Sequence, residues 1–368
     1  MTNHPGRRSP RVGLAMLTLV PGEMGGSESY ARGLCGALGA SSTFEGRAFV
    51  SAAAQNAIEG LPTEVVSEYP SGRTSLGKVY GLASGALRRR RISRHFADID
   101  VVHYPFTVPM PRLAVPSVVT LHDVQHLDLP ELFTPQTRAF RRLAYDRAAH
   151  RADVVIVPSE FVRGRAEALL DLDPSRVVVV PHGIDHSVFT PADVPREPFV
   201  LYPARVWPHK NHARLLDAFA LLRRERPDLE LVLTGGGTEA LAGPAGVRAR
   251  GIVPQAELVK LYQRAACVVF PSLYEGFGAP PLEAMACGAP VAASNAGSLP
   301  EVCGDAAVLF DPRESEAIAA GISQALDRSD ELLILGPTWS ARSTWASTAS
   351  GHERAYGSAA DSSVREIG

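Results

Sequence analysis

Short apolar runs that alternate with helical stretches constrain the fold of this chain more than any other feature. In the first half we expect strands over Val12–Thr18, Ala48–Ser51, Val101–His103, Ser117–Leu121, Val154–Val157 and Val177–Val180. Helical patterns fall between them, for example Ser27–Leu38 and Gln136–Arg151. Such alternation is typical of βαβ units and parallel sheets, so the chain predicts an α/β fold.

A polar, proline-rich stretch at Pro191–Pro198 interrupts this rhythm, and a second set of strands follows it. We expect that set over Phe199–Pro203, Glu230–Leu233, Val247–Arg250 and Cys267–Phe270. A chain of 368 residues is long for a single core. We therefore predict two Rossmann-like domains, residues 1–195 and 196–350, with parallel sheets that face an interdomain cleft.

The C-terminal segment, residues 351–368, is rich in Ser, Ala and Gly, and we expect it to be a flexible tail. Trp345 is the residue that would anchor a final helix if one crosses back onto the first domain.

Charge and composition exclude several classes of protein. The formal net charge of -2 argues against general nucleic-acid binding, which needs a basic footprint. No apolar run approaches the roughly 20 residues of a spanning helix, and Met1–Arg11 lacks the apolar region of a secretory signal. The four cysteines are scattered without metal or redox spacing, which favours free thiols and a cytoplasmic protein.

The segment Phe270–Pro290 carries the densest chemical information. Glu275 and Glu283 bracket a glycine-containing loop that leads into a helix. A helix N-terminus offers backbone N–H groups and a positive dipole end, which suit a phosphate. Carboxylates on either side can accept hydrogen bonds from hydroxyls. A ligand with hydroxyls on both sides of a phosphate is a nucleotide-sugar.

This segment resembles the Glu-x7-Glu signature of the retaining glycosyltransferases of family 4, which have the GT-B fold. Seven residues separate Glu275 from Glu283, as that pattern requires. Further segments resemble family landmarks in the family's order, over roughly Val12 to Pro312: Gly25–Glu28, Val157–Phe161, Val180–Asp185, Arg205–Asn211 and Asn295–Val302. An ordered set of this kind is more specific than any single motif.

The resemblance implies a hexosyltransferase that moves a sugar from a nucleotide donor to an acceptor hydroxyl with retained configuration, in polysaccharide, glycolipid or natural-product synthesis. It implies that Glu283 binds the donor ribose and Glu275 the transferred sugar. The backbone of Phe277, Gly278 and Ala279 would lie near the phosphates. The glycine turn Gly25-Gly26 would lie over the cleft, although a plain β–α turn is the ordinary explanation of two glycines.

Arg205 and Lys210 follow a strand of the second set, on a loop before a helix that Asn211 could cap. Two cations at a strand's carboxyl end suit a diphosphate, and fixed positive charge stabilises a leaving diphosphate in the transition state. A solvated loop is the alternative. Because these cations can replace a metal ion, we predict no required metal and no cofactor beyond the nucleotide-sugar.

Two further positions are expected beside the nucleotide. Gly235 opens a Gly-Gly-Gly turn that lacks the dinucleotide-binding fingerprint, and we expect a close-packed turn there. Val253 lies in the segment whose backbone would contact the base.

His122 ends another predicted strand. Its segment, Thr120–His126, resembles a mannosyl- and rhamnosyltransferase branch of the family, which favours mannose and GDP-mannose. His122 would approach the transferred sugar or carry a proton, and a structural role is the alternative. His182 is a departure, because the family more often has Asn before Gly183.

The acceptor is not identified by sequence; carbohydrate, lipid-linked and small-molecule acceptors all remain open. We expect its site at the segments Ser71–Lys78 and Tyr104–Arg112. A basic run, Arg88–Arg91 with Arg94, and a second set within Arg138–Arg151 suggest peripheral contact with an anionic membrane face. A solvated helix face is the alternative.

Other classes share this fold. A nucleotide-sugar epimerase and a non-catalytic nucleotide-sugar-binding protein remain alternatives, whereas a phosphorylase would need pyridoxal phosphate and a longer chain. No carboxylate is an obvious covalent nucleophile, so retention favours a front-face route in which the leaving phosphate accepts the acceptor's proton. This route is a hypothesis.

Overall fold

The computed structural model describes residues 9–41, 43–72 and 74–365, and these form two compact units. Unit 1 comprises the chain up to Gly183 together with the segment from Trp345, and unit 2 runs from Ile184 to Thr344. The boundary that the sequence predicts at 195/196 therefore lies inside unit 2. The Pro-rich segment, from which this boundary was predicted, leads into the first strand of unit 2, and the division between the two units lies before it.

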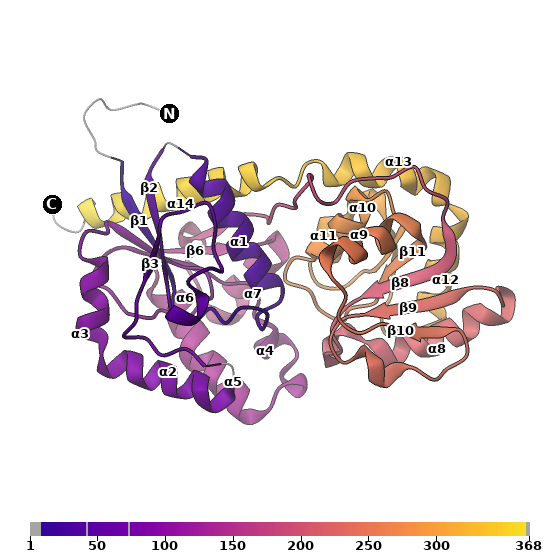
Figure 1. Ribbon diagram of the computed structural model, residues 1–368, viewed down its shortest axis with the longest axis horizontal. Helices are drawn as coiled ribbons and strands as arrows, with labels where there is room; N and C mark the ends of the chain where they lie inside the picture. Colours follow the sequence, from indigo (N-terminus) through magenta and orange to yellow (C-terminus); the bar gives the residue numbers. More distant parts are fainter. Residues whose placement is uncertain (1–8, 42, 73, 366–368) are drawn as a thin grey trace. The chain divides into compact units, whose positions relative to one another are not determined.

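Unit 1 contains a parallel seven-stranded sheet (Figure 1). Its strands are β1 (Arg11–Met16), β2 (Glu45–Val50), β3 (Thr63–Val65), β4 (Val101–Tyr104), β5 (Ser117–Thr120), β6 (Val154–Val157) and β7 (Val177–Val179). They are ordered β3-β2-β1-β4-β5-β6-β7, so the sequence of strands reverses direction between β1 and β4. Ligands of open α/β sheets bind at the carboxyl ends of strands next to such a reversal.

Helices cover both faces of this sheet. They are α1 (Gly26–Gly39), α2 (Ser75–Leu87), α3 (Arg89–Ile92), α4 (Gln125–Asp128), α5 (Pro135–Arg141), α6 (Arg147–Arg151), α7 (Glu160–Leu170) and α14 (Trp345–Arg365). One core lies between the sheet and α1 with α14, and another lies on the opposite face against α6 and α7. Strands buried on both faces explain why the β-branched runs of this half are so apolar.

The C-terminal segment differs from its prediction. Residues 351–365, expected to be a flexible tail, belong to α14, which packs beside α1 (Figure 1). Ala355 and Ala359 are buried there, and such small side chains allow close packing of the helix on the sheet; the large side chain of Tyr356 is buried as well. The Trp345 ring lies over Gly33, where a Cβ atom would come within 2.2 Å of it. The expectation that Trp345 anchors a final helix is confirmed.

Unit 2 contains a parallel six-stranded sheet of order β10-β9-β8-β11-β12-β13. The strands are β8 (Glu197–Pro203), β9 (Glu230–Thr234), β10 (Val247–Ala249), β11 (Ala265–Phe270), β12 (Val291–Ser294) and β13 (Val308–Phe310). Its helices are α8 (His212–Glu225), α9 (Gln255–Arg264), α10 (Ala279–Ala286), α11 (Leu299–Cys303), α12 (Ser315–Asp327) and α13 (Ser329–Ser340). Here the reversal lies between β8 and β11, so the loops after these two strands meet at one edge.

Three strands, β3, β12 and β13, lie outside the predicted set. Each has three or four residues, and β12 reads Val-Ala-Ala-Ser, which lacks the β-branched density of a recognisable strand. Pairing with a neighbour, rather than local propensity, decides their conformation. Among the helices of the described residues, none is both long enough and apolar enough to span a membrane.

Candidate functional site

Two loops of unit 2 that are far apart in sequence are joined at the reversal between β8 and β11. The backbone N–H of Leu273 donates to the carbonyl of His209 (2.8 Å), and the side-chain amide of Asn211 donates to the carbonyl of Pro271 (3.0 Å). Asn211 stands at the N-cap of α8, but its side chain makes no cap bond. Its side chain instead holds the Arg205–Lys210 loop against the loop that carries Glu275.

An ion pair closes this junction. Nζ of Lys210 lies 2.5 Å from Oε1 of Glu275, and both side chains are largely buried. Burial alone would raise the pKa of Glu275, but the charge and hydrogen bond of Lys210 outweigh that effect and hold the pKa below its usual value. Glu275 is therefore ionised at neutral pH. The structure brings together two of the predicted site residues, 65 positions apart in sequence.

Backbone around Glu275 is held from a third segment. The N–H and the hydroxyl of Ser298 both donate to the carbonyl of Glu275 (each 3.1 Å). Gly297 adopts a positive φ of 65°, and a Cβ atom there would lie 2.7 Å from the Glu275 nitrogen. Only glycine permits this approach.

Arg205 lies at the same edge of the sheet. Its guanidinium is 5.3 Å from the ring centroid of Trp207, a half-exposed side chain on the same loop. Among the described residues, no carboxylate lies within ion-pair distance of Arg205. Gly235, with a φ of 120°, packs so closely on Ala204 that a Cβ atom would clash at 2.6 Å, which confirms the close-packed turn expected there.

Helix α10 presents Glu283 on the adjoining loop–helix segment. Oε2 of Glu283 accepts a hydrogen bond from the Tyr262 hydroxyl at 3.4 Å. Burial raises the pKa of Glu283 to about 7, an effect that Tyr262 offsets only in part. A half-buried carboxyl with a weak partner is suited to accept hydrogen bonds from ligand hydroxyls.

The start of α10 is poorer in donors than the sequence argument assumes. The helix begins at Ala279, and its next two residues, Pro280 and Pro281, have no backbone N–H. Prolines favour the first helical turn but remove two of the four orphan donors. Phe277 and Gly278 immediately precede this turn, and Phe277 is buried with its carbonyl bound by Ser298 (2.6 Å). Val253 is half-buried at the edge of the unit 2 core, after β10.

The remaining predicted residues belong to unit 1. Gly25 is the N-cap of α1, with a φ of 56°, and Gly26 is the first helical residue. His122 follows β5, and its Nε2 donates to the carbonyl of Pro105 (2.8 Å). Because a carbonyl can only accept, Nδ1 is the acceptor nitrogen of this ring. Burial lowers the pKa of His122, against opposing effects of the Pro105 carbonyl and the Asp123 charge, so the ring is neutral.

The ring of Tyr30 lies edge-on to His122, with centroids 5.0 Å apart. Its hydroxyl bonds to Nε2 of His352 on α14 (2.6 Å) and to the hydroxyl of Thr120 (2.8 Å). Nδ1 of His352 donates to the carbonyl of Thr348 (2.8 Å), so its Nε2 must accept from Tyr30. Tyr30 therefore accepts from Thr120.

The same reasoning fixes the rest of this buried chain of hydrogen bonds. Thr120 gives its proton to Tyr30, so it accepts from Nε2 of His103 (2.8 Å). Nδ1 of His103 then accepts from the Tyr356 hydroxyl (2.9 Å). His182 stacks on Tyr30 at 4.5 Å, which gives the histidine at this position a packing role. Burial lowers the pKa of His103, His182 and His352, and that of His352 to about 4.

Tyr30, Tyr262, Asn211 and His352 were not among the predicted site residues. Each acts through a contact with a residue distant in sequence, and an isolated tyrosine or histidine gives no signal of such a contact. Within the described part of the chain, no three His, Cys, Asp or Glu side chains are grouped to hold a metal ion. The four cysteines are buried free thiols.

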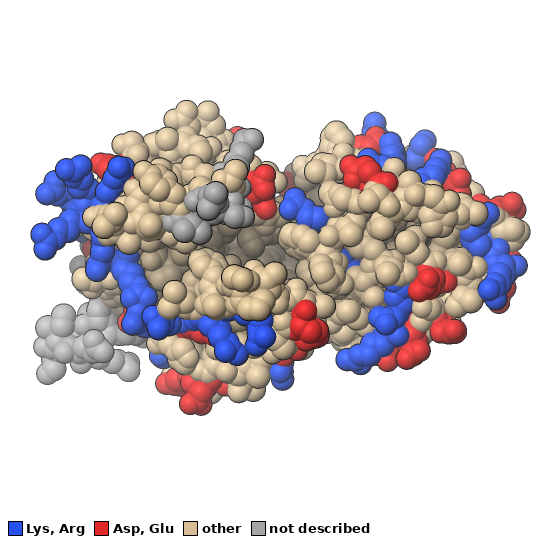
Figure 2. Space-filling model, turned by 90° about the horizontal axis from the view of Figure 1, so that it is seen from below, with Lys and Arg blue, Asp and Glu red and all other residues tan. Residues whose placement is uncertain are grey.

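Arginines gather on the surface of unit 1 formed by α2 and α3 (Figure 2). Arg88 to Arg91 are exposed there, beside Leu87, whose side chain is 89% exposed. In the second predicted basic set, Arg141 is paired with Asp123 at 2.7 Å, whereas Arg142, Arg147 and Arg151 are exposed. In the first set, the exposed side chains of Arg88 and Arg89 donate to the backbone carbonyls of Glu68 and Arg112.

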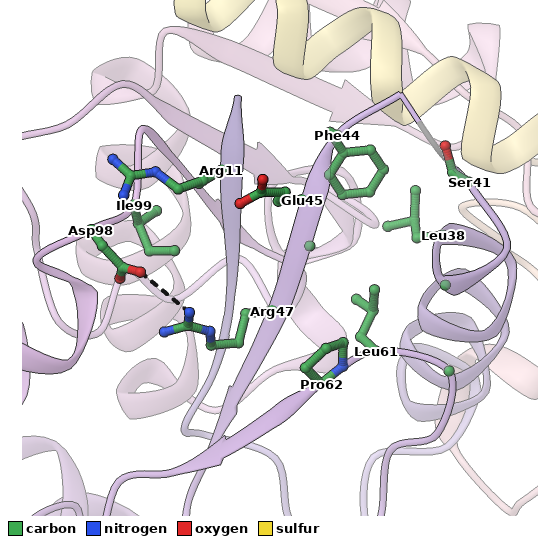
Figure 3. A pocket seen from close by; sticks show the side chains of 13 residues that line it. Arg11, Leu38, Ser41, Phe44, Glu45, Arg47, Leu61, Pro62, Asp98 and Ile99 are labelled. Carbon is green, nitrogen blue, oxygen red and sulfur yellow. Dashed lines mark hydrogen bonds and ion pairs between the residues drawn. The ribbon is translucent and has the colours of Figure 1, made fainter. Parts of the chain in front are cut away.

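A cavity of about 380 Å³ lies at the edge of the unit 1 sheet that is formed by the amino ends of its strands (Figure 3). Arg11 and Glu45, the first residues of β1 and β2, line it, and Arg47 pairs with Asp98 across its wall (3.2 Å). Because it lies at the amino ends of the strands, it contains none of the predicted site residues.

Comparison with known proteins identifies the family to which these two units belong. The family model described as "Glycosyltransferase Family 4" matches residues 24–188, and that described as "Glycosyl transferases group 1" matches residues 188–336. The D-inositol 3-phosphate glycosyltransferase of Thermobispora bispora is 30% identical over 316 residues, which cover 74% of this chain and 73% of that protein. The chain belongs to glycosyltransferase family 4. The resemblance inferred from the ordered motifs is thereby confirmed.

Another relative of this family 4 chain is the O-antigen chain mannosyltransferase B of Escherichia coli, 31% identical over 249 residues. That match covers 62% of this chain and 65% of the relative. The chain spans about half to two thirds of the length of several curated relatives, from 48% to 65%. Sucrose-phosphate synthase from Thermosynechococcus elongatus has a similar structure, with a TM-score of 0.78 at 21% identity over 95% and 98% of the two chains. The fold is accordingly of the GT-B type.

Proposed function

We propose that this chain transfers a hexose from a nucleoside-diphosphate sugar to an acceptor hydroxyl, with retention of configuration. One observation carries the proposal: the junction of the Arg205–Lys210 loop with the Glu275 loop at the strand-order reversal of unit 2. This junction combines a carboxylate for sugar hydroxyls with cations for a diphosphate. Family membership supports the same reaction class.

In this proposal Arg205 carries the largest share of charge stabilisation, since Lys210 is already paired with Glu275. The bond between the anomeric carbon and the diphosphate oxygen breaks, and that oxygen takes the proton of the acceptor hydroxyl as the new glycosidic bond forms. Glu283 binds the ribose. Neutral His122 offers Nδ1 to a hydroxyl of the transferred sugar. Trapping a stable glycosyl adduct on a side chain would contradict this front-face route.

Mannose is the proposed sugar and GDP-mannose the proposed donor. Support comes from the His122 segment and from a relative that is named a mannosyltransferase. A thermal-shift panel of GDP, UDP, dTDP and ADP tests the base, because a ligand that binds only the folded chain raises its melting temperature. A shift with UDP and none with GDP would reject the donor assignment.

Substitution of Arg205 tests the site itself. Arg205→Met is expected to lower turnover by about 10²–10³-fold, the usual effect of losing one charge-stabilising group. Arg248→Met is the matched control, because Arg248 is an exposed arginine of the same unit that pairs with Glu230. Near-full turnover of Arg205→Met in a folded protein would remove the diphosphate assignment.

We also propose peripheral contact of the Arg88–Arg91 surface with anionic lipid. Exposed Leu87 beside four arginines combines an apolar side chain with charge that attracts acidic headgroups. Sedimentation with phosphatidylglycerol vesicles tests this contact. A variant with Arg89, Arg90 and Arg91 changed to Gln should lose binding, and equal sedimentation with neutral phosphatidylcholine vesicles would contradict the proposal.

A further inference from the structure

A pocket of about 160 Å³ opens in unit 1 at the point where the strand order reverses. Thr18 and Met24 reach it from the segment after β1, and Phe106 and Val108 reach it from the segment after β4. Strands β1 and β4 are neighbours, and the chain proceeds outward from them in opposite directions. This is the position at which open α/β sheets bind ligands.

The walls of this pocket are mainly apolar. Tyr69 and Phe106 are buried in it, whereas Phe140 stands at its side with 41% of its surface exposed. The ring of Tyr145 meets Phe140 edge-on at 6.2 Å. Tyr145 is carried by a π-helical turn, Arg142–Asp146, and such turns occur frequently at functional sites. Few polar groups are available, so a bare sugar would leave its hydroxyls unpaired there.

Direct contacts connect the pocket to His122. Phe106 follows Pro105, whose carbonyl accepts the His122 hydrogen bond. On the other wall, Arg141 pairs with Asp123 and lies 5.2 Å from the Tyr145 ring centroid. The two walls therefore hold the adjacent residues His122 and Asp123 from either side. The pocket also includes Ser71, Gly72 and Gly77, so both segments expected to bind the acceptor contribute to it; position 73 lies outside the described residues.

We propose that this pocket binds an apolar group of the acceptor. The acceptor is then an amphiphile whose alkyl or aryl group enters the pocket while its hydroxyl lies near His122. This inference rests on the proposed transfer reaction. A dry cavity of about 150 Å³ holds one benzene molecule, so the pocket accommodates about six carbon atoms.

Titration of the whole chain with n-alkyl β-D-glucosides below their micelle concentrations tests the inference. From methyl through butyl to hexyl, affinity should rise about two- to fourfold per methylene, since each buried methylene contributes by the hydrophobic effect. From hexyl to octyl the affinity should level off, because the cavity is filled. Affinity that does not change from methyl to hexyl would overturn the proposal.

Two variants localise the effect. Phe140→Asp places a charge on the pocket wall and should abolish the gain with chain length. Leu143→Asp is the control, because Leu143 lies in the adjoining turn, is 56% exposed and does not line the pocket. Both side chains are partly exposed, so neither change should prevent folding. Equal loss of chain-length dependence in the two variants would also overturn the assignment.

Binding and turnover separate this inference from the proposed function. If affinity depends on chain length but no GDP-, UDP- or dTDP-sugar supports transfer, the pocket stands and the transfer proposal fails. If transfer occurs but methyl and hexyl glucosides bind and react equally, the transfer proposal stands and the pocket fails. The phenyl group of phenyl glucoside and the hexyl group of hexyl glucoside each have six carbon atoms. Comparison of the affinities of these two compounds then shows whether the pocket prefers an aromatic ring or an alkyl chain.

Discussion

Acidification should loosen α14 from unit 1 through His352, and the size of the effect follows from its buried position. Burial lowers the pKa of His352 from 6.5 to about 4. Between these values the unfolded chain binds more protons than the folded one, so stability is lost as the pH falls from about 6.5 to 4. The linkage relation gives a loss of about 2 kcal/mol between pH 7 and pH 5 from this group alone.

Hydrogen exchange of the α14 amides, read by mass spectrometry and corrected for intrinsic rates, is the suitable assay. It reports local opening, whereas the two units need not unfold together. His352→Gln keeps an acceptor for the Tyr30 hydroxyl but cannot take up a proton. The variant should therefore lose about 2 kcal/mol less than the parent chain between pH 7 and pH 5.

Exposed His150 supplies the control, because His150→Gln should leave the pH dependence unchanged. His103 and His182 remain in both proteins, so the dependence should be reduced rather than abolished. The same loss of protection in the parent chain and in His352→Gln would refute the reasoning. It would mean that the hydrogen-bonded chain from α14 to Tyr30 does not control how the helix is held.

Three other perturbations address unit 2. Donor binding should release about half a proton at pH 7, because hydrogen bonds from ribose hydroxyls lower the pKa of Glu283 from about 7. Calorimetry in buffers of different ionisation enthalpy measures the number of protons released. Proton release that persists in Glu283→Gln would show that another group is its source. Lys210→Met leaves the Glu275 charge buried without its partner and should cost about 3 kcal/mol in urea unfolding. Adding Glu275→Gln should restore most of that stability but not transfer, and failure to restore it would show that the ion pair is not the cause. Gly297→Ala should lower the melting temperature through strain at positive φ, whereas Gly36→Ala in α1, with open space around it, should not.

The sequence predicts what local chemistry determines. The strand Val154–Val157 was predicted with its correct bounds, because a short buried run of β-branched residues strongly favours a strand. Lys210 and Glu275 each follow a predicted strand of the second set, and the carboxyl ends of parallel strands share an edge of the sheet, so their placement at one edge follows from the sequence, whereas their ion pair was not predicted. The position of Asn211 was also predicted, but its role was not. A cap and a loop tether use the same residue, and only the partner carbonyl distinguishes them.

The segment that was predicted to be a flexible tail shows where inference from composition fails. Residues 351–365 have the Ser, Ala and Gly content of a disordered segment, yet they form a helix whose Ala355 and Tyr356 are buried. The sheet of unit 1 supplies the apolar surface that this helix covers, and that surface is built by strands more than 170 positions earlier. His352 and Tyr356 then bond to Tyr30 and His103, so the segment supports the residues around His122. Composition cannot reveal this role, because the same small residues that suggest disorder are those that let a helix pack closely on a sheet.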